Sequence, residues 1–167
     1  YNYNLDLRYE LFKENGNMFS VTAYYKHLEN PIEQIQELSG GATVHSFQNA
    51  SNGMATGLEI EFRKELLREL RLGANASFMY TDVKLPEGGA YTNTQRALQG
   101  ASPYLVNADI TYSPSFGEDQ QLNAALVYNL QGPRIQSVGI SGLGDVKQQP
   151  VHTLNFVGSF TFSKRVA

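Results

Sequence analysis

Apolar and polar side chains alternate with a period of two over most of this chain, and no other feature constrains the fold as strongly. In the first segment Leu5, Leu7 and Tyr9 fall on one face, and Asp6 and Arg8 fall on the other. Successive side chains of a β-strand point to opposite faces of a sheet, whereas the face of a helix repeats every 3.6 residues. The alternation therefore predicts a protein built from strands with one apolar face.

The same alternation recurs in seven segments that are separated by turn residues or by polar stretches. The predicted strands cover residues 2–13, 18–28, 54–64, 70–82, 104–113, 121–131 and 151–163. Consecutive strands joined by short turns pair in the antiparallel sense. The predicted fold class is all-β, an antiparallel meander of about seven long strands.

The stretch from Lys64 to Leu70 favours a different local structure, because Lys-Glu-Leu-Leu-Arg-Glu-Leu contains strong helix formers. An amphipathic helix is one interpretation. Strict alternation nevertheless runs up to Phe62 and begins again at Leu70. We therefore expect a tight or briefly helical turn at 65–69.

Strand length and charge placement indicate a membrane-spanning wall rather than a soluble sandwich. Several segments run for about ten residues, whereas strands of soluble sheets cluster near 5–6 and a membrane-spanning strand needs about 9–11. Charged residues make up 17% of the chain, against roughly 25% in soluble domains. The central residues of the apolar strand faces are all uncharged, as expected where Arg or Lys at the bilayer midplane costs roughly 2–4 kcal/mol. A soluble sandwich would carry more Lys and Glu on its outer face.

The connections between the predicted strands alternate in length. The short ones are Asn15-Gly16, a dipeptide suited to a two-residue hairpin turn, then 66–69 and 113–120. The long ones are 28–55, 82–103 and 131–149. Bacterial barrels have short periplasmic turns and long extracellular loops. We expect the long segments to face the cell exterior and the turns at 13–17, 65–69 and 113–120 to face the periplasm.

The register predicts which side chains share each face. The apolar face should hold Leu58, Ile60, Phe62, Leu72, Ala74, Phe78, Val106, Ile110, Leu126 and Phe160. The opposite face supplies the candidates for lining the lumen, which are Asp6, Arg8, Glu10, Glu59, Glu61, Arg63, Asn75, Asn107 and Asp109. The charged members would form either a polar track along the lumen or cross-strand ion pairs that stabilise the wall.

The composition argues against catalysis, metal binding and nucleic-acid binding. Glu59 and Glu61 sit two apart on one strand face without a histidine or nucleophile nearby, so we predict no enzyme activity. The three histidines, His27, His45 and His152, are far apart and match no ligand motif, and there is no cysteine, so no metal or other cofactor is expected. With a net charge of −3 and no basic patch, no nucleic-acid partner is expected.

Six stretches give a more specific resemblance. They are Asn30-Pro31-Ile32-Glu33, residues 55–64 (ATGLEIEFRK), residues 72–77 (LGANAS), residues 96–108 (RALQGASPYLVNA), and Leu126-Val127-Tyr128-Asn129 with Gly132-Pro133-Arg134-Ile135. Together they resemble the C-terminal half of the β-barrel of TonB-dependent outer-membrane receptors, especially those of Bacteroidetes. The resemblance extends over essentially the whole chain, residues 1–167.

The resemblance implies a wall segment of a transporter that imports a scarce nutrient through a plugged barrel in the outer membrane of a Gram-negative cell. The implied partners are outer-membrane lipid, the receptor's own plug domain, TonB and a surface lipoprotein. Because seven strands do not close a barrel of even strand number, we expect a partial barrel. The resemblance further implies that the plug domain and the final strands of such a receptor are absent from residues 1–167, and that the charged residues of the polar face would be a polar track for substrate or plug movement. Two alternatives are a plug-less, porin-like barrel and a soluble β-rich binding module.

Overall fold

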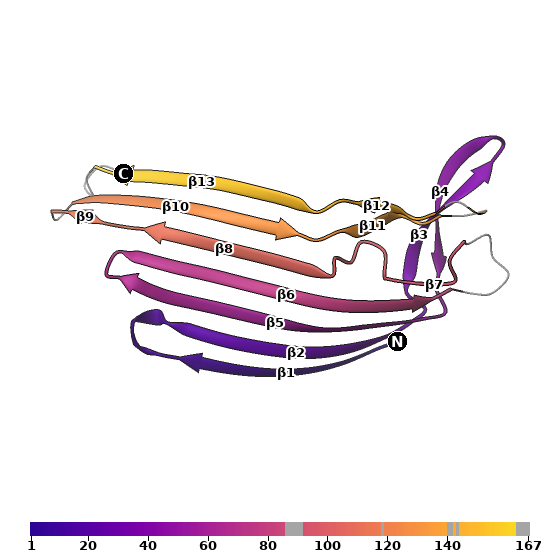
Figure 1. The fold of residues 1–167 in the computed structure, drawn as a ribbon, viewed down its shortest axis with the longest axis horizontal. Coiled ribbons are helices and arrows are strands. Elements are labelled where there is room, and N and C mark those ends of the chain that lie inside the picture. Colours follow the sequence, from indigo (N-terminus) through magenta and orange to yellow (C-terminus); the bar gives the residue numbers. More distant parts are fainter. Residues whose placement is uncertain (86–91, 118, 140–141, 143, 163–167) are drawn as a thin grey trace.

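One antiparallel sheet dominates the computed structural model, which describes residues 1–85, 92–117, 119–139, 142 and 144–162 (Figure 1). Seven long strands follow one another across this sheet in sequence order, apart from hairpins inserted between them. They are β1 (Asn2–Phe12), β2 (Met18–Glu29), β5 (Asn52–Leu67), β6 (Leu70–Lys84), β8 (Tyr104–Tyr112), β10 (Gln120–Gln131) and β13 (Val151–Thr161). The predicted meander of seven long antiparallel strands is confirmed. Residue 163 of the last predicted strand lies outside the described residues.

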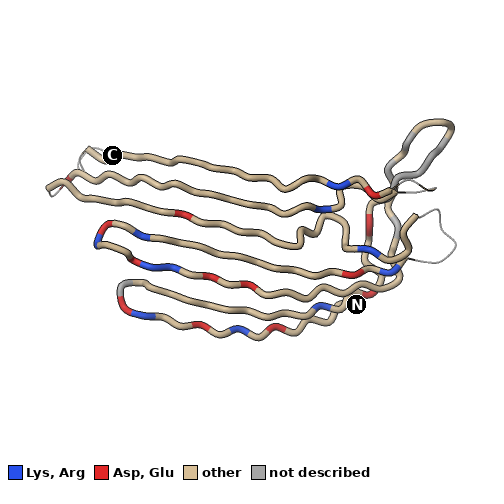
Figure 2. Tube along the Cα trace, viewed as in Figure 1, with Lys and Arg blue, Asp and Glu red and all other residues tan. Residues whose placement is uncertain are grey.

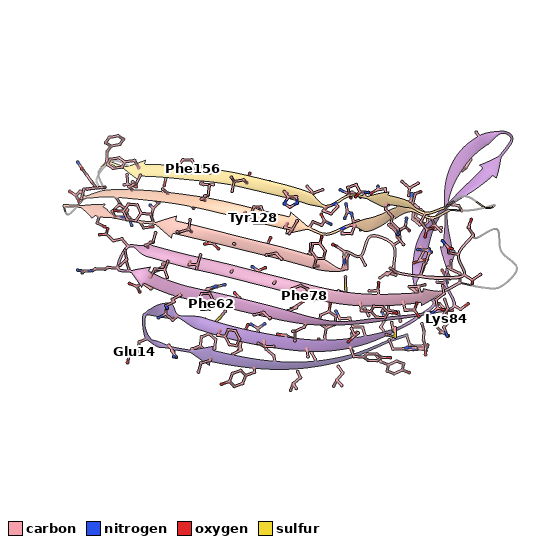
Figure 3. The ribbon with its side chains drawn as sticks, viewed as in Figure 1. Glu14, Phe62, Phe78, Lys84, Tyr128 and Phe156 are labelled. Carbon is pink, nitrogen blue, oxygen red and sulfur yellow. The ribbon has the colours of Figure 1, made fainter. Side chains whose placement is uncertain are left out.

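The strand register places the predicted apolar residues on one face of this sheet. Directly opposed residues of antiparallel neighbours share a face. Leu58 is opposite Phe78, Leu72 is opposite Ile110, and Ile110 is in turn opposite Leu126. The remaining predicted members follow in the same register, so the predicted face is confirmed. Figure 3 places Phe62, Phe78, Tyr128 and Phe156 across four strands of the sheet.

The short connections lie together at one end of the sheet and the long connections at the other, here named the turn end and the loop end (Figure 1). The first turn differs from the two-residue turn that the sequence predicts. It is a 3-10 turn, η1 (Glu14–Gly16), closed by the Lys13 amide donating to the Asn17 carbonyl at 2.9 Å. Gly16 does adopt the positive φ expected of it, 71°. The additional residues let η1 contact β5, because the Asn17 side-chain oxygen accepts from the Glu65 amide at 2.6 Å.

The two other turns also differ in extent from the predicted ones. β5 continues through the helix-favouring stretch to Leu67 with a bulge near Leu66, and only Arg68 and Glu69 separate it from β6. Pairing with β6 therefore outweighs the local helix propensity. The turn at 113–120 contains β9 (Ser115–Phe116), which pairs with the start of β10.

The long connections contain ordered hairpins, which the alternation pattern did not predict. The first holds β3 (Ile32–Ser39) paired with β4 (Ala42–Asn49), and the third holds β11 (Arg134–Ser137) paired with β12 (Val146–Gln148). In the second connection, β7 (Gln95–Arg96) pairs with the end of β6, while residues 86–91 lie outside the described part. The sequence did not reveal these strands, because both of their faces carry polar residues and they therefore lack the alternation of apolar and polar positions.

Among the described residues, the large apolar side chains along the apolar face of the sheet are exposed and do not form a core. Leu7 is 76% exposed and Phe156 is 73% exposed. A small core lies instead at the loop end, where Ala50, Val83 and Leu85 are buried together and Leu98 packs against them.

Among the described residues, no helix combines the length and apolar character needed to cross a membrane.

Candidate functional site

A row of polar side chains crosses the face opposite the apolar one. Its members are successive register partners on all seven wall strands: Glu10, Ser20, Glu61, Asn75, Asn107, Asn129 and Thr153. The row begins two residues before the end of β1 and finishes two residues after the start of β13. The strands are therefore staggered along the sheet, as the tilted strands of a barrel wall require.

Four charged side chains form a chain of ion pairs over this face. Arg8 lies 2.7 Å from Glu10 on the same strand and 3.9 Å from Glu61, which is two strands away. Arg63 lies 2.7 Å from Glu61. The reach from β1 to β5 is possible because the strand between them presents the small Ser20, which is buried between the longer side chains. Two cations and two anions are thus mutually compensated.

The structure brings several predicted site residues around one hollow. A space of about 300 Å³ is lined by Arg8, Glu59, Glu61, Asn75 and Asn107, together with Ser20, Thr22 and Ser77 among others. The Asn107 amide donates to the Asn75 side-chain oxygen at 2.7 Å. The lining offers hydrogen-bond donors and acceptors of both charges, which suits hydration or contact with a polar surface.

Two predicted site residues, Arg63 and Asp109, line a different hollow nearer the turn end, of about 740 Å³. The carboxylate of Asp109 lies directly over Gly73, its register partner, in the space that a Cβ atom there would occupy. Glycine at this position therefore lets the carboxylate lie flat on the sheet. Asp6 is not among the lining residues of either hollow and is opposite Tyr24 in the register.

Charge is distributed unevenly between the two halves of the sheet (Figure 2). β1 and β5 carry the charged residues of the ion-pair chain. β8 contains one charged residue, Asp109, and β10 and β13 contain no Asp, Glu, Lys or Arg. The polar face of the second half is therefore lined mainly by neutral amides, hydroxyls and small residues.

A second cluster of polar side chains, which the sequence analysis did not predict, lies buried at the loop end. Arg96 on β7 donates to the carboxylate of Glu33 on β3, and their side chains are only 3% and 1% exposed. Burial raises the pKa of the Glu33 carboxyl, and the Arg96 guanidinium opposes that rise. Ionisation of Glu33 by itself thus disfavours the folded state as pH rises through its pKa, and Arg96 offsets this penalty.

Gln99 extends this cluster to all three long connections. Its side-chain oxygen accepts from the Gln34 amide at 2.9 Å, and its side-chain nitrogen donates to the Gln136 carbonyl at 3.0 Å. We name Glu33, Arg96 and Gln99 the loop junction. The sequence contained a signal for it, because all three lie in stretches that carried the family resemblance. Their roles were not predicted because their separation along the chain gives no hint of contact.

A meander of long staggered strands, with one exposed apolar face and one polar face, defines a segment of a transmembrane β-barrel wall. Comparison with protein families agrees over the whole chain. Residues 1–167 match the family described as TonB dependent receptor-like, beta-barrel, and the chain belongs to this family. The Bacteroidetes subtype stays a prediction.

Among solved structures, the chain is similar to a mutant of the ferric enterobactin receptor of Pseudomonas aeruginosa, with a TM-score of 0.61 and 16% identity. The match covers 98% of this chain and 24% of that receptor, so this chain spans about a quarter of the receptor's length. At this identity the likeness concerns the fold. A comparison with curated proteins gave no match.

Members of the family are transporters of the outer membrane rather than enzymes. Within the described residues, no group of three or more His, Cys, Asp or Glu side chains is placed to hold a metal ion.

Proposed function

We propose that this chain forms part of the wall of an outer-membrane transporter that imports a scarce nutrient in a TonB-dependent step. The observation that carries this proposal is the row of polar side chains from Glu10 to Thr153, which is backed on all seven strands by an exposed apolar face. An apolar face suits lipid, and a polar face suits a hydrated lumen that encloses a plug domain. TonB and a surface lipoprotein complete the proposed partners.

The two faces can be tested by a matched pair of single cysteines in the full-length protein in lipid. A nitroxide at Ile60 should be relaxed mainly by oxygen, which concentrates in the bilayer. A nitroxide at the neighbouring Glu61 should be relaxed mainly by a water-soluble nickel complex. Equal accessibility of both labels to the nickel complex would favour the soluble binding module instead.

Orientation follows from the segregation of the connections. Cysteines introduced at Phe47 and Thr92 should react with a membrane-impermeant thiol reagent on intact cells, and cysteines at Gly16 and Ser115 should react only after the outer membrane is broken. The reverse pattern would contradict the proposed topology.

A test of TonB-dependent uptake distinguishes the proposed transporter from a plug-less porin. Growth on the limiting nutrient should fail equally when the full-length gene or TonB is deleted. Unaltered growth without TonB would favour the porin.

A further inference from the structure

Three sequence stretches that are far apart along the chain meet at the loop end. Glu33 comes from the first, Arg96 and Gly100 come from the second, and Ile135 comes from the third. Besides the buried Glu33–Arg96 pair, the Gly100 amide donates to the Ile135 carbonyl at 3.0 Å. The three long connections therefore pack together as one structural unit rather than as three separate loops.

Within the described part of the chain, β3 and β4 pair with each other and not with a strand of the main sheet, so the β3–β4 hairpin forms a separate two-stranded sheet. Two backbone hydrogen bonds form its neck, from the Asn30 amide to the Ser51 carbonyl and from the Ala50 amide to the Pro31 carbonyl. Asn30 adopts a φ of 51°, a left-handed conformation that reverses the chain direction where the hairpin leaves β2. These two hydrogen bonds alone do not fix the direction of the hairpin, and Ala50 in the neck also packs against Val83 and Leu85.

Contacts beyond the neck fix its position. In Figure 1 the hairpin runs crosswise to the wall strands at the loop end, beside β7 and β11, and β3 contacts β11 directly. The Glu33–Arg96 pair joins it to the second long connection, and the Gln34 amide joins it to Gln99. The hairpin thus reaches from the end of β2 across the sheet to the extension of β10.

We propose that the β3–β4 hairpin is a strap across the loop end, and that the buried Glu33–Arg96 pair is the latch that holds it. Gln99 is a positioning residue that aligns the strap with β11. Breaking the latch frees the hairpin as one body, while the wall strands keep their pairing. This inference does not depend on the transported substrate or on TonB.

Because both partners of the pair are buried, the loss of either one should open the junction rather than weaken it slightly. Removing one partner leaves the other charge buried without compensation, so the junction opens to solvate it. Dissolved salt screens the attraction within such a buried pair much less than it screens the exposed pairs on the polar face. Arg96 Nε is itself buried without a hydrogen-bond partner among the described residues, so the closed junction lacks one of its available bonds.

The test uses the full-length protein in lipid with nitroxides at Phe47→Cys and Val146→Cys, one exposed position on the strap and one on β12. We expect a single narrow distance peak in the parent and its loss in both Glu33→Gln and Arg96→Gln. Glu14→Gln, an exposed carboxylate at the turn end, is the matched control and should keep the peak. Hydrogen exchange at the Gln34 amide should accelerate roughly a hundredfold or more in the two latch variants.

Heat-dependent migration on a denaturing gel reports separately whether the barrel has folded. A narrow peak that survives in either latch variant would overturn the proposal, because the strap would then be held by other contacts. Loss of barrel folding in both latch variants would overturn it equally, because the pair would then support the wall and not the strap.

Discussion

The wall and the loop junction of this protein are stabilised in opposite ways. The wall exposes apolar residues such as Leu7 on one face and compensates exposed charges such as Arg8 on the other. The loop end buries both charge and apolar surface, through Glu33 and Arg96 of the loop junction and through the small core around Val83. The wall depends on its hydrogen-bonded ladders and on the solvent at each face, whereas the junction depends on a few buried side chains. Substitutions should therefore have very different effects in the two regions.

The largest effect is expected at the junction. Arg96→Met should reduce the local free energy of unfolding by about 3–5 kcal/mol, because it leaves the Glu33 carboxylate buried without a partner. The double variant Glu33→Leu/Arg96→Met should be markedly more stable than this single variant. Native-state hydrogen exchange of residues 93–102 measures the difference. Additive effects of the two substitutions would show that the pair is not coupled.

The second largest loss of stability is expected from a charged substitution on the apolar face of the wall. Ile60→Lys should cost roughly 2–4 kcal/mol in a bilayer, since it places an ammonium group where lipid is expected. Glu61→Lys, one residue away on the polar face, is the matched control and should cost much less. The concentration of urea that abolishes the heat-dependent gel shift in lipid vesicles gives both values. Equal losses would contradict the assignment of the two faces.

A smaller effect is expected within the polar row. Asn107→Ala removes the donor of the 2.7 Å hydrogen bond to Asn75 and should cost about 1 kcal/mol, because one neutral side-chain bond is lost and hydration replaces part of it. Asn129→Ala, in the same row but without such a bond to a described residue, should cost less. Urea unfolding in vesicles distinguishes them, and a larger loss at Asn129 would place the important contact elsewhere.

The smallest effect concerns the exposed ion pairs. Arg8 and Glu10 are 49% and 39% exposed, so solvent screening leaves Arg8→Gln a loss of less than about 1 kcal/mol. This loss should shrink further when salt is raised from low ionic strength to 1 M, whereas the Arg96→Met effect should persist. A salt-independent loss at Arg8 would mean that the ion-pair chain behaves like the buried junction.

The sequence alone determined the wall. Period-two alternation is a local property, so the residues of each strand show which of its faces is apolar and which is polar. The number of wall strands, their antiparallel pairing and the segregation of short and long connections could be predicted from this alternation and from the segments between the strands. The first turn was predicted too short. The turn at 65–69 was predicted too long, because β5 stays paired as a strand as far as Leu67, although the expectation that no long helix forms there is confirmed.

Only the tertiary structure decided the stagger and the loop junction. The row from Glu10 to Thr153 depends on how far each hairpin is shifted against the next, and no single strand contains that information. Glu33 and Arg96 are 63 residues apart, and Gln34 and Gln99 are 65 apart. Each of these residues is unremarkable in its local pattern. Their contact arises because a hairpin with its own narrow neck crosses the ends of the wall strands, a non-local arrangement that alternation cannot encode.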